Sequence, residues 1–205
     1  MFPSIPPITW MLLVANGIVY LLQGLLDPQL VLWLALWPIH SGNSGTVGFL
    51  PWQLVTYSFL HGNLLHLAVN MLALYMFGSD IERVFGERRF LSYYLVCVVT
   101  AALAQLLVSA MSGSPPYPTV GASGGVFGVL LAFALYFPHR TVMLVFPPIP
   151  MPAWLFVTLY GVLELYLGIT GTQAGVAHFA HLGGMLGGYA MIRYWRGRPP
   201  TRRRW

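Results

Sequence analysis

The segment FLSYYLVCVVTAALAQLLVSAM, residues 90–111, contains no charged side chain. A helix of this length is about 33 Å long at 1.5 Å per residue, and the hydrocarbon core of a bilayer is about 30 Å thick. The whole chain has a similar character, because 57% of its 205 residues are hydrophobic and 7% are charged. Soluble domains carry about 25% charged residues. Composition therefore excludes a soluble α/β enzyme, a disordered regulator and a fibrous protein, and predicts a membrane protein.

Several stretches are long and apolar enough to cross a bilayer as helices. There are six, namely Ile8–Leu26, Leu54–Phe77, Phe90–Met111, Val120–Phe137, Pro152–Ile169 and Gly175–Trp195. Leu30–Trp37 is too short to cross and ends at Pro38, so we expect it to lie in the membrane interface. The first stretch has no charged leader and no small-residue cleavage site before it, so we expect a retained helix rather than a signal peptide.

The basic residues fix the expected orientation. With six spans, the loops after the second and fourth spans and the C-terminal tail share one side of the membrane. All ten basic residues are arginines, and all lie on or at the edge of that side: Arg83, Arg88, Arg89, Arg140, Arg193, Arg196, Arg198, Arg202, Arg203 and Arg204. The positive-inside rule makes that side cytoplasmic and places both termini there. The basic tail 196–205 is then a topology anchor and lipid contact, and no nucleic-acid partner is expected.

The sequence predicts one domain over residues 1–205, an all-α polytopic bundle. Clusters of Pro, Gly and Ser at His40–Gly48, Ser112–Pro118 and Pro147–Pro152 are interpreted as connections between spans. The single cysteine, Cys97, excludes an internal disulfide and a cysteine metal site and is read as a small hydrophobic residue. We expect no cofactor and no metal.

Polar residues are costly inside a membrane and often mark function. His66 and Asn70 are separated by four residues, so they share a helix face near the start of the second span. Ser123 opens the fourth span, and His181 lies near the start of the sixth. These three spans all begin on the outer side, so the polar groups are expected in one layer just below the outer surface.

Glycine spacing favours close contact between the fourth and sixth spans. Small residues four apart let membrane helices approach closely, and the pairs are Gly121/Gly125, Gly124/Gly128 and Gly184/Gly188. Packing through these glycines would bring Ser123 within hydrogen-bond range of His181, which could take the proton of the serine hydroxyl. The run Gly121–Gly125 also reads G-x-S-x-G, but no strand precedes it, so the nucleophile elbow of soluble hydrolases is not expected.

Together these motifs resemble the rhomboid intramembrane serine proteases. The resemblance is carried by His61, His66 and Asn70 in the second span, by Gly121–Gly124, by Ala180, His181, Gly184 and Gly188, and by Glu82, Arg83, Gly86, Arg89 and Phe90. It implies a six-helix core that cleaves transmembrane segments of single-span membrane proteins within the lipid bilayer. It further implies that residues 152–169 form a gate and residues 170–174 a cap.

The resemblance also implies roles for individual residues. Ser123 would be the nucleophile and His181 the general base and acid. His66, Asn70 and the Ser123 amide would form the oxyanion hole. The supporting residues would be His61, Gly121, Gly124, Phe127, Gly184 and Gly188.

Three features depart from the family pattern. Trp52 is followed by Gln53 where members often have arginine, and Phe127 stands where some carry tyrosine. Glu164 has no counterpart in a Ser–His dyad. It has three interpretations: a third catalytic member, a group that polarises water near the gate, or a side chain that extends outward to the membrane surface. His178 is interpreted as a polar residue near the cap, with a water relay as the alternative.

Two other functions compete with proteolysis. A catalytically silent rhomboid-like scaffold would bind membrane-protein clients, but such relatives typically lack the serine or the histidine. A small transporter would use the histidines as a proton relay, but the expected inverted repeat is absent. Compact size and the lack of a targeting leader favour a prokaryotic plasma membrane, with the active site opening to the extracytoplasmic side.

Overall fold

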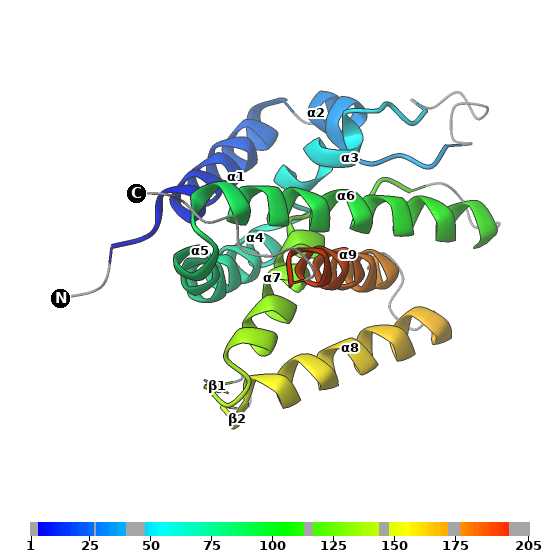
Figure 1. The fold of residues 1–205 in the computed structure, drawn as a ribbon. Coiled ribbons are helices and arrows are strands. Elements are labelled where there is room, and N and C mark those ends of the chain that lie inside the picture. The colour runs from blue at the N-terminus through cyan, green and yellow to red at the C-terminus, as the bar shows by residue number, and fades with distance from the viewer. Residues whose placement is uncertain are drawn as a thin grey trace.

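Helices make up most of the chain in the computed structural model, which describes residues 4–26, 28–39, 48–112, 117–143, 148–171 and 177–196 (Figure 1). The helices are α1 (Pro7–Leu26), α2 (Gln29–Leu34), α3 (Gln53–Thr56), α4 (Leu64–Ala73), α5 (Ser79–Phe85), α6 (Glu87–Ser112), α7 (Ser123–Tyr136), α8 (Ala153–Thr170) and α9 (His178–Arg196). A 3-10 turn, η2 (Tyr57–Phe59), follows α3, and a π-helical turn, η3 (Leu74–Gly78), joins α4 to α5. Two short strands, β1 (Thr141–Met143) and β2 (Pro150–Pro152), pair antiparallel.

Four helical stretches in the described residues are long and apolar enough to cross a membrane. They are Pro7–Leu26, Leu64–Phe85, Glu87–Met111 and Ala153–Thr170. α7 is apolar but has only 14 residues, or about 21 Å of helix. α9 has 19 residues and ends in a basic turn with Arg193 and Arg196. The chain is therefore mainly helical with several membrane-spanning helices, and the count of six spans stays a prediction.

The predicted second span, Leu54–Phe77, is wrong at both ends. Its first residues form α3 and η2, and the long helix begins only at Leu64. Asn63 stops the helix from extending backwards, because its extended backbone and its side chain, which accepts the His66 N–H at 2.8 Å, make it an N-cap. At the other end the helix continues through η3 to Phe85, where Gly86 ends it with a φ of 75°.

Beyond its apolar part the helix carries a buried carboxylate, Glu82. Glu82 accepts the backbone N–H groups of Ile8 and Thr9 at 2.9 and 2.6 Å and the Thr9 hydroxyl at 2.7 Å. A negative charge at a helix N-terminus satisfies its free donors and complements its dipole. Glu82 thus fastens α5 to the start of α1.

The fourth predicted span, Val120–Phe137, also begins too early. Gly121 has a φ of 127°, and its N–H donates to the Tyr57 carbonyl at 3.0 Å, so the chain is not helical there. Thr119 pairs with Leu36 in an isolated β-bridge. These contacts anchor the segment before Ser123 to the loop formed by α2 and α3. α2 itself spans six residues, too few to cross a bilayer, as predicted.

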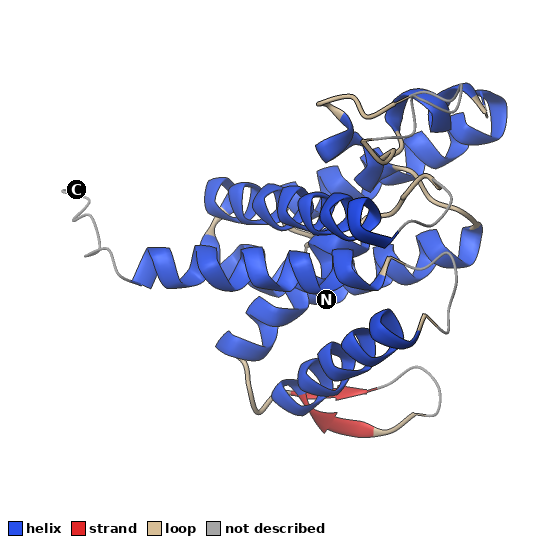
Figure 2. Cartoon of the chain, turned by 90° about the vertical axis from the view of Figure 1, so that its right-hand side faces the viewer, coloured by secondary structure: helices blue, strands red, loops and turns tan. Residues whose placement is uncertain are grey.

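α7 occupies the centre of the bundle, where ten of its fourteen residues are buried. α6 and α9 run side by side and pack most extensively, and α7 packs against both (Figures 1 and 2). The helices approach closely because a Cβ at Gly184 would collide with the backbone carbonyl of Gly124. β1 and β2 lie at the edge of the helical body beside the start of α8 (Figure 2).

Gln53 holds the loop that precedes the long helix α4. Its side chain is fully buried, and Oε1 accepts the backbone N–H groups of Trp37 and Leu50, both at 3.2 Å. Trp52 lies at the surface and donates its indole N–H to the Trp33 carbonyl at 2.9 Å. Gln53 thus ties the described parts of this loop together without a charge.

Candidate active site

Ser123 and His181 form a direct hydrogen bond. Ser123 Oγ lies 2.7 Å from His181 Nε2. The serine is the first residue of α7, and the histidine lies one turn into α9. The close approach of Gly124 to Gly184 brings these two helix starts together, as the glycine spacing predicted. A serine hydroxyl bonded to a neutral imidazole nitrogen has a base ready to take its proton.

Phe127 holds the imidazole from one side. Its ring stacks on that of His181 with centroids 4.3 Å apart and planes 5° from parallel. Tyr160 of α8 also packs against Phe127, with ring centroids 6.2 Å apart. Phenylalanine therefore preserves the stacking expected of an aromatic residue here.

His66 and Asn70 line the same groove as Ser123. The His66 ring presses against Gly121, where an added Cβ would lie 2.7 Å from its Cε1 and 2.8 Å from its Nε2. The Asn70 amide donates to the His66 carbonyl at 2.9 Å and has a second N–H to offer. The backbone N–H of Ser123 has no intrahelical acceptor, because it opens α7.

His61 supports this wall rather than facing the groove. Its ring is buried and meets the His66 ring edge to face, with centroids 5.0 Å apart. Neither ring nitrogen has a hydrogen-bond partner in the described residues. Burial, with repulsion from His66, lowers the pKa of His61 to about 4. His61 is therefore neutral at physiological pH.

Glu164 is buried and connects two histidines. Its Oε2 lies 2.8 Å from Nδ1 of His181 and 2.7 Å from Nδ1 of His178. The interpretation that Glu164 extends outward to the membrane surface is wrong, since its side chain turns inward to α9. The ligand atoms of these three residues lie within 4.8 Å of one another, so the residue types suit a divalent cation such as zinc. A cation there would have to displace both hydrogen bonds.

A groove of about 1070 Å³ opens beside Ser123 and His181. Apolar side chains of α4 and η3 form one wall, and residues of α8 form another. The main lining residues are Leu65, Val69, Leu72 and Met76 of α4 and η3, Val126, Phe127 and Leu130 of α7, and Phe156, Tyr160 and Glu164 of α8. Sequence analysis did not select Tyr57 or Tyr160, because an aromatic residue in an apolar span gives no signal of its own.

The fold and this site define a multi-pass helical membrane protein with a serine and a histidine joined at an apolar groove. Residues 49–198 match the family model of the Rhomboid domain. The chain belongs to the rhomboid family.

Similarity to individual rhomboid proteins agrees with the family match. The chain is 33% identical over 140 residues to the rhomboid protease GluP of Bacillus subtilis, a match covering 67% of this chain and 25% of GluP. It is 33% identical over 132 residues to the mitochondrial Rhomboid protein 1 of Saccharomyces cerevisiae, covering 64% and 38%. It is 29% identical over 160 residues to the human mitochondrial presenilin-associated rhomboid-like protein, covering 72% and 40%. The matches thus span a quarter to two fifths of these relatives.

Proposed function

We propose that the protein is an intramembrane serine endopeptidase that cleaves transmembrane segments of single-span membrane proteins. The observation that carries the proposal is the 2.7 Å bond between Ser123 Oγ and His181 Nε2 on the wall of an apolar groove. Family membership supports it, since one relative is named a rhomboid protease. His61, Gly121, Gly124, Phe127, Gly184 and Gly188 support the site by packing.

The proposed reaction begins with proton transfer from Ser123 Oγ to His181 Nε2. Oγ attacks the carbonyl carbon of the scissile peptide, and the carbonyl oxygen becomes an oxyanion. When this tetrahedral intermediate collapses, the C–N bond breaks and His181 gives the proton to the leaving amine. A water molecule then repeats the sequence on the acyl-enzyme, with His181 as base, and releases Ser123.

The oxyanion would be stabilised by three donors. They are the Ser123 backbone N–H, the second amide N–H of Asn70 and the His66 ring, and all three residues line the groove. Donors fixed before the reaction stabilise developing charge without reorganising. The N-terminus of α7 adds the positive end of its dipole.

The dimensions of α7 support a site inside the bilayer. Arg140 follows α7 closely and marks its cytoplasmic end in the proposed topology. Ser123 then lies about 21 Å above that end, and so about 9 Å below the outer edge of a 30 Å hydrocarbon core. The groove would admit a substrate segment from the lipid, while water would reach Ser123 from the outer side.

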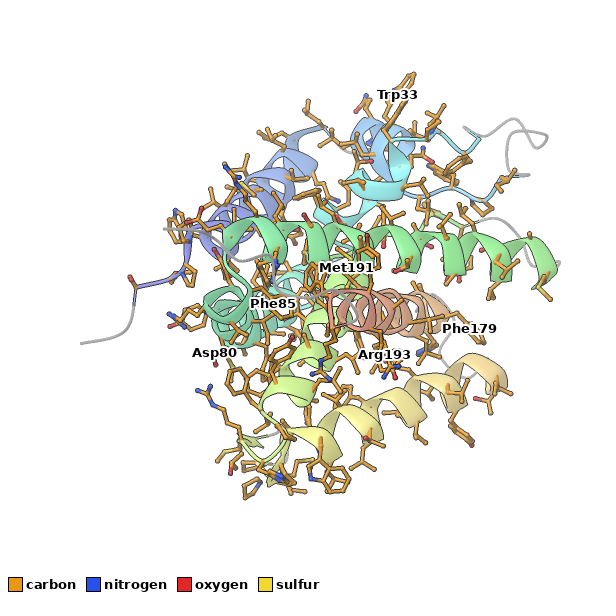
Figure 3. All side chains as sticks on the ribbon, viewed as in Figure 1. Trp33, Asp80, Phe85, Phe179, Met191 and Arg193 are labelled. Atoms are coloured by element: carbon orange, nitrogen blue, oxygen red, sulfur yellow. The ribbon has the colours of Figure 1, made fainter. Side chains whose placement is uncertain are left out.

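The proposed topology has six spans, α7 and α9 included, with both termini cytoplasmic and residues 1–205 forming one domain. In support, the described arginines gather at one end of the bundle, at the end of α5, the start of α6, the end of α7 and the end of α9. Asp80 on α5 and Phe179 at the start of α9 lie at opposite ends (Figure 3). We propose a prokaryotic plasma membrane as the location.

The test is cleavage of a single-span reporter protein in liposomes by the wild type and by Ser123→Ala. We expect the wild type to cut and the variant to be inactive, with a fluorophosphonate probe labelling the wild type alone. Equal cleavage by both would reveal a contaminant. A folded wild type that neither cuts any of several reporters nor reacts with the probe would contradict the proposal and favour a scaffold that binds membrane-protein clients.

A further inference from the structure

Glu164 is a buried acid next to a histidine whose other nitrogen contacts the proposed nucleophile. Its exposed fraction is 8%, and an ionised carboxylate is stable at such a position only when donors surround it. Its Oε2 contacts Nδ1 of His178 and Nδ1 of His181 at 2.7 and 2.8 Å. Both contacts have the length of charge-assisted hydrogen bonds.

The hydrogen bonds determine which nitrogen of His181 carries the proton. A neutral imidazole has one N–H, so a ring whose Nε2 accepts from Ser123 must be protonated at Nδ1. That N–H points to Glu164 Oε2. In the other tautomer the ring proton is on Nε2. The His181 ring would then donate an N–H to Ser123 and could not accept the serine proton.

His178 supplies the second donor to the same oxygen. Its Nε2 is buried without a partner in the described residues, whereas its Nδ1 lies 2.7 Å from the carboxylate. A ring proton on Nδ1 of His178 can therefore be donated to Glu164, which is the partner of this ring among the described residues. The carboxylate then holds two N–H donors from successive turns of one face of α9.

The position of Glu164 on α8 also links two helices of the site. Most of the second half of α8 is exposed, and Glu164 is its buried residue among the described ones. Its bonds to α9 thus link the groove wall formed by α8 to the base on α9.

We propose that Glu164 and His178 are positioning residues that hold His181 in the reactive tautomer and stabilise its protonated form during the reaction. The chain would then contain a Ser123–His181–Glu164 relay, extended by His178, rather than a dyad. This inference rests on the proposed function, because it gives Glu164 a role in the same proton transfer.

The first test is Glu164→Gln, measured as separate kcat and KM values on the reporter. An amide replacing the acid of a Ser–His–Asp triad lowers kcat about 10⁴-fold because the ring adopts the wrong tautomer. We expect a kcat loss of roughly 10²- to 10⁴-fold here, with KM changed less than about threefold. Glu164→Asp keeps the carboxylate and should recover at least about tenfold of the loss. Glu87→Gln makes the same chemical change at an exposed position on α6 and should match the wild type.

His178 is tested with a matched pair. His178→Gln retains a side-chain N–H donor, whereas His178→Leu has none. We expect the leucine variant to lose more kcat than the glutamine variant, by about threefold to tenfold. Equal activity of Glu164→Gln and wild type, with Ser123→Ala inactive, would overturn the relay and leave the proposed function intact.

A second measurement does not depend on activity. Nitrogen-15 spectra of histidine-labelled wild-type protein in micelles, with His181 assigned by the His181→Asn variant, report which ring nitrogen is protonated. We expect His181 and His178 protonated at Nδ1, with the His181 proton far downfield, and loss of that signal in Glu164→Gln but not in Glu87→Gln. A His181 protonated at Nε2 in the wild type would overturn the inference, even if no reporter is ever cut.

The same three residues could instead hold zinc. The relay predicts that EDTA leaves wild-type cleavage and the histidine spectra unchanged. A loss of activity on chelation that is restored by zinc would assign the cluster to a metal and overturn the relay.

Discussion

Phe127 lies flat against His181, with ring centroids 4.3 Å apart and planes 5° from parallel. Phe127 lies about one turn into α7 and His181 about one turn into α9. This contact is therefore set by the same close helix approach that joins Ser123 to His181. The stacked ring limits rotation of the imidazole about its Cβ–Cγ bond. Orientation of the base thus depends on an aromatic neighbour as well as on Glu164.

Replacing Phe127 with leucine should lower kcat. An aromatic pair contributes about 0.5–1.5 kcal/mol beyond simple burial, which corresponds to a rate loss of about twofold to twelvefold. Phe127→Tyr keeps the ring and should stay within about twofold of the wild type. Reporter cleavage in liposomes measures both variants. A leucine variant as active as the wild type would show that stacking does not position His181.

Gly184→Ala should separate α7 from α9. The added Cβ would meet the Gly124 carbonyl, which belongs to the backbone and cannot rotate away. Overpacking of this kind costs about 1–3 kcal/mol, and displacement of His181 from Ser123 should lower activity more than about tenfold.

Gly17→Ala in α1 is the matched control, because its Cβ would have no atom within 4 Å. Unfolding can be followed by thiol-reactive dye on Cys97, the single and buried cysteine. We expect a lower Tm for Gly184→Ala and an equal or higher Tm for Gly17→Ala. A Gly184→Ala protein with wild-type Tm and activity would rule out the tight contact.

Sequence reasoning identified the family and selected three site residues, because each belongs to a local pattern. Ser123 lies between paired glycines, His181 lies in a helix rich in small residues, and Phe127 is an aromatic residue one turn after Ser123. Apolar length also indicated the helices. It misplaced the start of the second span because Leu54–Leu60 is apolar, while the boundary depends on one N-cap, Asn63. Local patterns with fixed spacing were predictable, and boundaries set by a single hydrogen bond were not.

Long-range pairing is the second limit. Glu164 and His178 lie 14 residues apart, and their bond depends on how α8 leans on α9. The role of Gln53 also depends on a fold contact, because its acceptor oxygen reaches the Trp37 N–H 16 residues away. No periodicity encodes either contact. The sequence shows that these polar residues are unusual in their positions, but it does not predict which residues they contact.

Stability should fall in mild acid because of His61. Burial holds its pKa at about 4 in the folded protein, below the value of about 6.5 in an unfolded chain. Between these two values the unfolded chain binds a proton that the folded protein does not, so the free energy of unfolding decreases as pH drops from about 6.5 to about 4. The His66 ring lies against that of His61, with ring centroids 5.0 Å apart.

The variant His61→Phe removes this dependence, because a phenyl ring has no nitrogen that binds a proton. Its Tm should change less than that of the wild type between pH 7 and pH 4.5. His139→Phe, at an exposed histidine after α7, is the control and should keep the wild-type slope. Parallel slopes for all three proteins would show that His61 is not the group responsible.

Glu82→Ala should loosen the start of α1. The substitution leaves the N–H groups of Ile8 and Thr9 and the Thr9 hydroxyl without their acceptor, and an unsatisfied buried donor costs about 1–3 kcal/mol. The free donors can partly rearrange at a helix end, so we expect a net loss of about 2–4 kcal/mol in the free energy of unfolding.

Glu82→Gln keeps an acceptor oxygen but not the charge, and its stability should lie between those of Glu82→Ala and the wild type. Glu87→Ala removes an exposed acid from the first turn of α6 and is the control, with an expected loss of no more than about 1 kcal/mol. Dye labelling of Cys97 on heating gives the Tm of each variant. Hydrogen exchange of the backbone amides in the first turn of α1 shows whether the loss of stability is local to that turn. Faster exchange confined to that turn supports a local cap, whereas unchanged exchange in Glu82→Ala would mean that other groups hold α1 against α5.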